Sequence, residues 1–344
     1  MVTRVEGIGK TGTRQLSLHY TGSSRPFTMR CPRAAAVGRV VIWRFRYNAG
    51  FLIPFCSGFF MSHYYRLVVS CPDRRGIVAR VSGFIAGHGG SITEASQHSD
   101  LEAGRFFMRY EILADSIGMS ASELTEAFDP VAREFDMEWA LRDTRRRPRV
   151  VIMVSRESHC LVDLLYRWTA GELDGDIVGV ISNHDDMRGL VEWHELPYFH
   201  VPVQADDKDA AFAEVERRVE ALKADVVVLA RYMQILPPRL CQRYAGRVIN
   251  IHHSFLPSFA GARPYHQAHS RGVKLIGATC HYVTEELDAG PIIEQDIHRV
   301  SHCHTPQDLV RFGRDVEKAV LARGLRWHLE DRVLIHGNKT VVFA

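Results

Sequence analysis

The stretch Val248-Ile249-Asn250-Ile251-His252-His253-Ser254-Phe255-Leu256-Pro257 gives the clearest indication of how the larger part of the chain folds. Its first five residues predict a buried strand, and the residues that follow predict a loop. Because side chains alternate along a strand, Asn250 and His252 are expected on one side and His253 on the other. An amide and an imidazole on the same side can polarise a carbonyl group and move a proton. We therefore expect acyl chemistry where this strand ends.

Other strands of the same kind surround this one in the sequence. Apolar runs predict strands at residues 150–154, 177–181, 199–203, 226–230 and 248–252, with helices between them, notably at 210–222 and 238–244. Alternating strands and helices with apolar strands are typical of an α/β fold with a mostly parallel, Rossmann-like sheet covered on both faces. Ligands of such sheets bind at the carboxyl ends of the strands. The pattern ends with strands at 274–284 and 291–300, a helix at 305–328 and a strand at 340–344.

Residues 62–142 predict a separate, smaller domain. The expected order is strand 65–71, helix 77–88, strands 91–99 and 105–114, helix 120–135 with Ser122 and Glu126 near its start, and strand 137–142. This βαββαβ order is ferredoxin-like. The run Cys71-Pro72-Asp73-Arg74-Arg75-Gly76-Ile77-Val78 and the break at Gly89-Gly90 resemble the ACT domain. The resemblance implies a homo-oligomer and an amino acid effector bound near Asp73 and Gly76, or a domain that only supports assembly.

The first 61 residues differ in charge from the rest of the chain. They contain nine basic residues and one acidic residue, a net charge of +8, so the remainder carries −5 of the total of +3. We expect an unstructured tail or an upstream translation start that precedes a working start at Met61. A mitochondrial presequence and a nucleotide loop at Gly9-Lys10-Thr11 are alternatives. Residues 143–148 predict a linker between the ACT domain (62–142) and the larger domain (149–344).

Composition limits the classes of protein to consider. Hydrophobic residues make up 46% and charged residues 24% of the chain, as in soluble globular proteins. No apolar run reaches the roughly 18–20 residues of a membrane helix, so no membrane partner is expected. The seven scattered cysteines contain no C-x-x-C pair, which favours a reducing, cytoplasmic setting. The acidic body predicts no nucleic-acid partner.

The larger domain resembles the folate-dependent formyltransferases. The resemblance lies in the Asn250-to-Phe259 motif together with Asp288 in Leu287-Asp288-Ala289-Gly290-Pro291-Ile292-Ile293. It implies that Asn250 stabilises the oxyanion, that His252 transfers the proton, and that Asp288 orients His252 and water. It also implies a folate substrate contacted by Arg231, Met233, Gln234, Ile235, Leu236, His253 and Ser254. Core packing is the alternative for Met233 and Ile235, and a structural role is the alternative for His253.

The loop Ser155-Arg156-Glu157-Ser158 indicates which acceptor takes the formyl group. It contains no glycine that could cradle a substrate phosphate, and Glu157 would repel one. We expect no basic, nucleic-acid-binding domain after the larger one, so water is the expected acceptor. Together with Ile181-to-Asp186 and Ala230-to-Leu236, this loop resembles formyltetrahydrofolate deformylases over residues 62–344.

That resemblance implies hydrolysis of 10-formyltetrahydrofolate to tetrahydrofolate and formate. The formate would supply purine synthesis and balance one-carbon pools, and no metal or other cofactor is expected. Transfer of the formyl group to a small amine is the alternative activity, and a catalytically silent folate sensor is the alternative outside enzymes.

Overall fold

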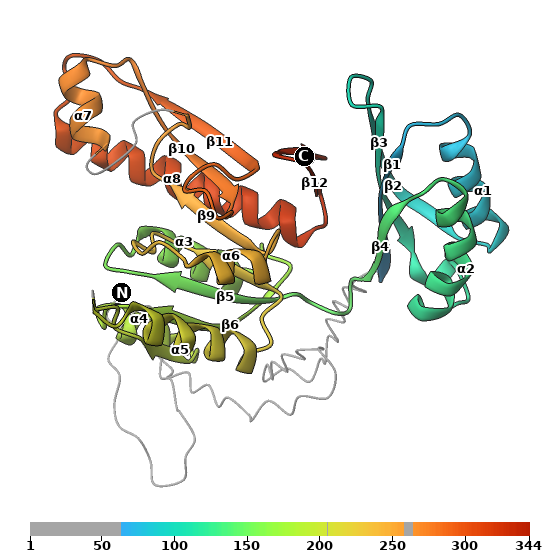
Figure 1. Ribbon diagram of the computed structural model, residues 1–344, viewed down its shortest axis with the longest axis horizontal. Coiled ribbons are helices and arrows are strands. Elements are labelled where there is room, and N and C mark those ends of the chain that lie inside the picture. Colours follow the sequence, from blue (N-terminus) through green and yellow to red (C-terminus); the bar gives the residue numbers. More distant parts are fainter. Residues whose placement is uncertain (1–62, 205, 258–263) are drawn as a thin grey trace, which may run out of the picture. The chain divides into compact units, whose positions relative to one another are not determined.

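The computed structural model describes residues 63–204, 206–257 and 264–344. The predictions for residues 1–61 lie outside this part of the chain, as do Ser258 and Phe259 of the motif. Within it, the elements follow the predicted order of a small antiparallel unit and then a larger, mostly parallel unit (Figure 1).

The smaller unit has the predicted ferredoxin-like arrangement. Its elements are β1 (Tyr64–Pro72), α1 (Ile77–Gly87), β2 (Ser91–Asp100), β3 (Arg105–Leu113), the 3₁₀ turn η1 (Ala114–Ser116), α2 (Ala121–Glu134) and β4 (Glu138–Asp143). The strands pair in the antiparallel order β2-β3-β1-β4. Both helices cover one face of this sheet (Figure 1).

Helix α2 begins within a residue of the predicted start. Ser120 caps the helix: it accepts a hydrogen bond from the backbone N–H of Glu123, and the Glu123 carboxylate accepts one from the backbone N–H of Ser120. Ser122 and Glu126 lie in the first turns of the helix, as predicted, and Ser120 has the extended backbone that a capping residue needs.

The larger unit is a seven-stranded sheet in the order β11-β10-β9-β8-β5-β6-β7. Strands β5 to β9 are parallel, while β10 and β11 run antiparallel. The elements are β5 (Arg149–Val154), α3 (His159–Thr169), β6 (Asp176–Ser182), α4 (Arg188–Trp193), β7 (Tyr198–His200), α5 (Lys208–Ala221), β8 (Val226–Leu229), α6 (Pro238–Arg243), β9 (Val248–His252), α7 (Pro264–Arg271), β10 (Leu275–Tyr282), β11 (Ile292–Arg299), α8 (Pro306–Leu329), β12 (Val333–His336) and β13 (Lys339–Val342).

Strand β5 shows why apolar runs predicted a sheet covered on both faces. Val150, Ile152 and Val154 pack into one hydrophobic core that contains residues of α3 and α8. Val151 and Met153 pack into a second core with residues of α5 and α6. Since both sets are buried, the strand has no polar face to alternate with an apolar one.

Two ends of the sheet differ from the prediction. Strand β7 covers residues 198–200 instead of 199–203, because it ends before Pro202, which cannot donate a backbone hydrogen bond to a ladder. The final strand β13 pairs with the unpredicted β12 in a separate two-stranded sheet.

The strand order brings three carboxyl ends to one edge of the sheet. Met153 of β5 lies opposite Leu229 of β8, and Leu229 lies opposite Asn250 of β9. The residues that follow these positions therefore share that edge. The chain leaves β5 toward β6 on one side and returns to β8 on the other, so this edge is also the point where the strand order reverses, the usual place for a ligand.

The last helix, α8, has close contacts with the ACT strands. Arg109 of β3, whose side chain is 1% exposed, donates from Nε to the carbonyl oxygen of Glu330 at 3.0 Å and forms ion pairs with Glu94 and Glu111. Arg66 of β1 donates from Nη1 to the carbonyl oxygen of Leu329 at 3.3 Å. The carbonyl groups at the end of α8 therefore have guanidinium partners from the other domain.

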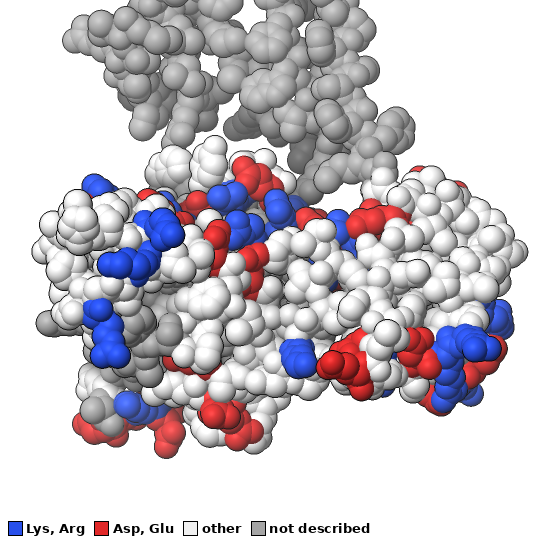
Figure 2. Space-filling model, turned by 90° about the horizontal axis from the view of Figure 1, so that it is seen from above, with Lys and Arg blue, Asp and Glu red and all other residues white. Residues whose placement is uncertain are grey.

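The surface of the described residues carries both signs of charge close together. Figure 2 shows basic and acidic side chains interleaved over the face that it draws. Pairs such as Arg243 with Glu216, at 2.7 Å, and Arg188 with Asp185, at 2.8 Å, illustrate this compensation. No helix in the described ranges is both long and apolar enough to span a membrane.

Candidate active site

His252 and Asp288 form a pair at the edge of the sheet where β9 ends. Nδ1 of His252 lies 3.2 Å from Oδ2 of Asp288. The His252 side chain is only 9% exposed, and among the described residues its Nε2 atom has no hydrogen-bond partner. With Nδ1 directed at the carboxylate, Nε2 is the nitrogen that can accept a proton.

Asp288 lies in the turn between β10 and β11, and the backbone there is unusual. Its φ is 54°, in the left-handed region that few non-glycine residues adopt. The turn is also tight at Gly290, where an added Cβ would collide with the carbonyl oxygen of Tyr282. The hydrogen bond from His252, with His281 also close at 3.7 Å, holds the pKa of the Asp288 carboxyl well below its usual range, despite partial burial. The carboxylate is therefore negatively charged at neutral pH.

Asn250 lies beside a histidine that the sequence reasoning missed. In the antiparallel β9–β10 pair, His281 is directly opposite Asn250, and Nε2 of His281 lies 3.1 Å from Nδ2 of Asn250. Because Nδ1 of His281 is 2.9 Å from the carbonyl oxygen of Tyr282 and must donate there, Nε2 accepts from the Asn250 amide. This fixes which way the amide points and leaves its second N–H for a ligand. The sequence did not predict that the 248–252 strand pairs with the 274–284 strand, and that pairing is the signal that would have found His281.

The stretch from Arg231 to Leu236 follows β8 at the same edge. Met233 and Ile235 are 56% and 69% exposed, so the alternative of core packing is wrong for both, whereas Leu236 is buried. Gln234 is partly buried. The stretch is anchored because the backbone N–H of Met233 donates to Oγ of Ser155 at 3.0 Å. The result is an apolar surface held in place at the sheet edge.

The loop after β9 differs from the simple strand geometry. The His253 ring lies 5.2 Å from the His252 ring, so it does not face away from His252 as the alternation rule predicted. The reason is that β9 ends at His252 and the chain turns. Burial, then the charge of Arg231, lower the pKa of His253 to about 4. Ser254 is buried next to it, and its carbonyl oxygen accepts from the Thr279 hydroxyl at 2.9 Å.

In the loop after β5, Glu157 has a basic partner. Its Oε2 lies 2.7 Å from Nη2 of Arg314 in α8. In the ACT unit, Asp73 and Gly76 are both exposed in the turn between β1 and α1. Gly76 has a φ of 92°, a left-handed backbone conformation that glycine adopts easily, so the shape of the turn also explains a glycine at this position.

The comparisons with known proteins match both domains. The Formyl transferase family matches residues 148–325, and the ACT domain matches residues 65–118. Formyltetrahydrofolate deformylase of Bacillus subtilis is 50% identical over 283 residues, which cover 81% of this chain and 93% of that protein. The chain belongs to the formyltetrahydrofolate deformylase family. Membership confirms the predicted fold class and the predicted enzyme class, a hydrolase.

Solved structures agree with this family. A crystal structure of a formyltetrahydrofolate deformylase from Pseudomonas syringae is 66% identical, with a TM-score of 0.82, over 83% of this chain and 96% of that one. A glycinamide ribonucleotide transformylase from Symbiobacterium toebii is 30% identical, with a TM-score of 0.55, over 58% of this chain and 95% of that one. The deformylase family thus shares its larger domain with formyltransferases.

Proposed function

We propose that this protein hydrolyses 10-formyltetrahydrofolate to tetrahydrofolate and formate, with Asn250, His252 and Asp288 as the catalytic residues. The observation that carries the proposal is the His252 ring, which has one nitrogen directed at the Asp288 carboxylate and the other buried without a partner among the described residues. Such a ring can accept a proton from water and return it to a leaving nitrogen.

The reaction can be written with these groups alone. The oxygen of a water molecule attacks the formyl carbon while Nε2 of His252 takes a proton from it. Negative charge then builds on the formyl oxygen, and the Asn250 amide donates its free N–H to that oxygen. When the bond between the formyl carbon and N10 breaks, N10 receives the proton from His252. Formate leaves as the anion and releases the second proton of the water to the solvent.

Asp288 supports these steps without exchanging a proton. Because His252 and His281 hold the pKa of its carboxyl well below the usual range, the carboxylate stays ionised when His252 is protonated. Its negative charge stabilises the imidazolium and fixes the ring orientation. The exposed side chains of Met233 and Ile235 offer an apolar surface for the flat ring system of the folate, with Arg231, Gln234, Leu236, His253 and Ser254 as the remaining proposed contacts.

Release of formate without any acceptor tests this proposal. Purified protein should convert 10-formyltetrahydrofolate to equal amounts of tetrahydrofolate and formate in buffer alone. If formyl transfer occurs only after a small amine is added, the alternative activity, a formyltransferase, replaces the proposed one. If His252→Ala hydrolyses as fast as the wild type, the measured activity belongs to a contaminant. A hydrolase of this kind would supply formate for purine synthesis and balance one-carbon pools.

An amino acid effector at the ACT domain is a separate part of the proposal. Asp73 and Gly76 are the proposed contacts because both are exposed in one turn. Titration calorimetry with glycine and with methionine should give heat for one of them and a change in hydrolysis rate. If neither changes, the ACT domain is left as an assembly device, and the hydrolysis proposal is unaffected.

A further inference from the structure

Building on the proposed function, we propose that four residues beside His252 close the active site against amines and thereby make water the acceptor. These residues are Glu317, Tyr265, His159 and Arg231, which we call the Glu317 cluster. Arg231 already belongs to the stretch proposed to contact the folate. The proposal gives the other three residues, which lie outside that stretch and the motif, a role in specificity.

The centre of the cluster is a buried carboxylate. Glu317, on α8, has a side chain that is 1% exposed. Its Oε1 accepts a hydrogen bond from the Tyr265 hydroxyl at 2.5 Å, and its Oε2 lies 2.7 Å from Nε2 of His159 and 3.4 Å from Nε of Arg231. Burial alone would raise the pKa of this carboxyl, but His159 and Arg231 outweigh that effect, and the net direction is down. A buried carboxylate with three partners holds those partners rigidly.

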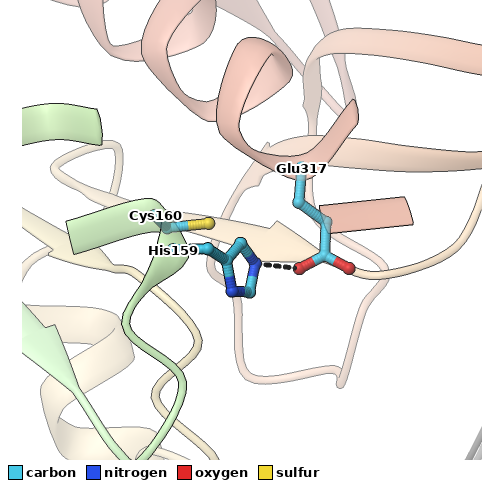
Figure 3. Close-up of side chains that lie close together, drawn as sticks. All are labelled: His159, Cys160 and Glu317. Carbon is cyan, nitrogen blue, oxygen red and sulfur yellow. Dashed lines mark hydrogen bonds and ion pairs between the residues drawn. The ribbon is translucent and has the colours of Figure 1, made fainter. Parts of the chain in front are cut away.

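A metal site is the other interpretation of this region. His159, Cys160 and Glu317 place potential ligand atoms within 4.8 Å of one another (Figure 3). Three features oppose it. Both oxygens of Glu317 already have protein partners, the Arg231 guanidinium would repel a cation, and burial raises the pKa of the Cys160 thiol well above its usual value. The donor set therefore suits a hydrogen-bonded ion pair better than a cation.

A chain of contacts links the cluster to His252. The Tyr265 ring lies 6.4 Å from the His253 ring, and the His253 ring lies 5.2 Å from the His252 ring. Tyr265 also packs against α8 at Gly313, where an added Cβ would collide with its ring. The aromatic ring therefore has a fixed position between the carboxylate and the pair of histidines.

A hollow borders the cluster at His159. It has a volume of about 460 Å³ and is lined by His159, His266 and residues of α8, including Arg311, Arg314 and Lys318. His159 thus belongs both to the wall of this hollow and to the hydrogen-bonded cluster. A volume of this order is sufficient for a small molecule. We infer that opening the cluster would join this hollow, which is large enough for a small second substrate, to the place where the formyl group reacts.

The reaction expected in an opened variant is formyl transfer. The amine nitrogen forms a bond to the formyl carbon as the bond from that carbon to N10 breaks. The proton lost by the amine passes through His252 to N10, so the products are the N-formyl amine and tetrahydrofolate. The chemistry of the catalytic residues is unchanged, and only the nucleophile differs.

Hydroxylamine is a suitable probe because it is small and largely uncharged near neutral pH. We would incubate enzyme with 10-formyltetrahydrofolate and hydroxylamine and measure the ratio of formohydroxamate to formate, after subtracting the reaction without enzyme. The wild type should give almost only formate. Tyr265→Ala should raise the ratio at least about tenfold, the scale on which one pocket contact discriminates substrates. His159→Ala, which opens the cluster from the side of the hollow, should raise it too.

Matched variants distinguish the effect of the Tyr265 ring from the effect of its hydroxyl hydrogen bond. Tyr265→Phe keeps the ring, so it should retain the wild-type ratio, and Tyr166→Ala removes an exposed tyrosine of α3 and should do the same. The proposal is overturned if wild type already forms formohydroxamate at the variant level, or if folded Tyr265→Ala keeps the wild-type ratio. Circular dichroism checks folding, and His159→Ala decides if Tyr265→Ala does not fold. Absence of formate from wild type without hydroxylamine would instead remove the proposed hydrolysis itself.

Discussion

The pair of His252 with Asp288 and the pair of His159 with Glu317 join the same two kinds of group in the same domain, but their surroundings differ. Asp288 is 27% exposed and Glu317 is 1% exposed. Each ring has one buried nitrogen without a hydrogen-bond partner among the described residues, Nε2 of His252 and Nδ1 of His159, but Nδ1 of His159 lies 3.7 Å from a second carboxylate, Glu157. An imidazole held by one carboxylate can still act as a base, whereas one between two carboxylates serves to hold structure.

The largest effect should come from removing the base of the His252–Asp288 pair. His252→Ala should lower kcat for formate release by about 10²–10⁴-fold, the usual contribution of a positioned acid–base group. Stopped or continuous assays of tetrahydrofolate formation measure it. His200→Ala, at an exposed histidine of β7, is the control and should keep wild-type turnover. A decrease below tenfold in His252→Ala would remove the distinction between the two pairs.

Removing the charge of Asp288 should have the next largest effect. Asp288→Asn should lower kcat by about 10²-fold, because the side chain still fits but no longer stabilises the imidazolium. Asparagine is the suitable substitution since it tolerates the positive φ of this residue better than alanine does. Asp185→Asn, at an exposed aspartate, is the matched control. Equal kcat for Asp288→Asn and wild type would contradict a catalytic role for the carboxylate.

The free energy of unfolding should change most when the surroundings of the His159–Glu317 pair are altered. Tyr265→Phe removes one of the three partners of the buried Glu317 carboxylate and should lower the free energy of unfolding by about 1.5–3 kcal/mol, the value of a hydrogen bond to a charged group. Urea denaturation measures this free energy. Tyr166→Phe is the control, because that exposed ring should contribute little. An unchanged midpoint for Tyr265→Phe would mean that water replaces the hydroxyl and that the cluster is not rigid.

A further effect, on the pH dependence of stability, concerns His253, which lies between the two pairs. Its folded pKa of about 4 is below the unfolded value of 6.5, so the unfolded chain binds more protons between these values. Stability should therefore fall as the pH decreases from 6.5 to 4, by up to about 1.4 kcal/mol per pH unit from this residue. His253→Gln should flatten that dependence in denaturation curves measured across this window. His269→Gln, at an exposed histidine, should leave it intact, and equal slopes in both variants would be the contrary result.

The sequence predicted the pair of His252 with Asp288 but could not predict the pair of His159 with Glu317. Asn250 and His252 are two residues apart on an apolar strand, so their common side follows from local geometry. Their family motif also supplied Asp288. Glu317, Tyr265 and His159 come from three different helices, and nothing in their separate sequences indicates that they meet.

The fold shows the same limit. Apolar runs predicted β5 and β9 to within a residue, because burial on both faces leaves a strong signal. The periodicity of the chain did not predict β12, a four-residue strand whose only partner in the described chain is the equally short β13. The predicted orientation of His253 was wrong for a related reason. The alternation rule applies only as far as the strand continues, and β9 ends one residue before His253.

The guanidinium groups at the end of α8 have a consequence for how the chain can be divided. The carboxyl end of a helix carries partial negative charge from its aligned peptide dipoles, and cations there stabilise the helix. Here Arg66 and Arg109 supply those cations from the ACT strands. A fragment cut at residues 143–148 would lose both guanidinium groups and leave Arg326 and His328 as the basic side chains in the last turn of α8. The ACT domain therefore completes a helix of the larger domain as well as forming a unit of its own.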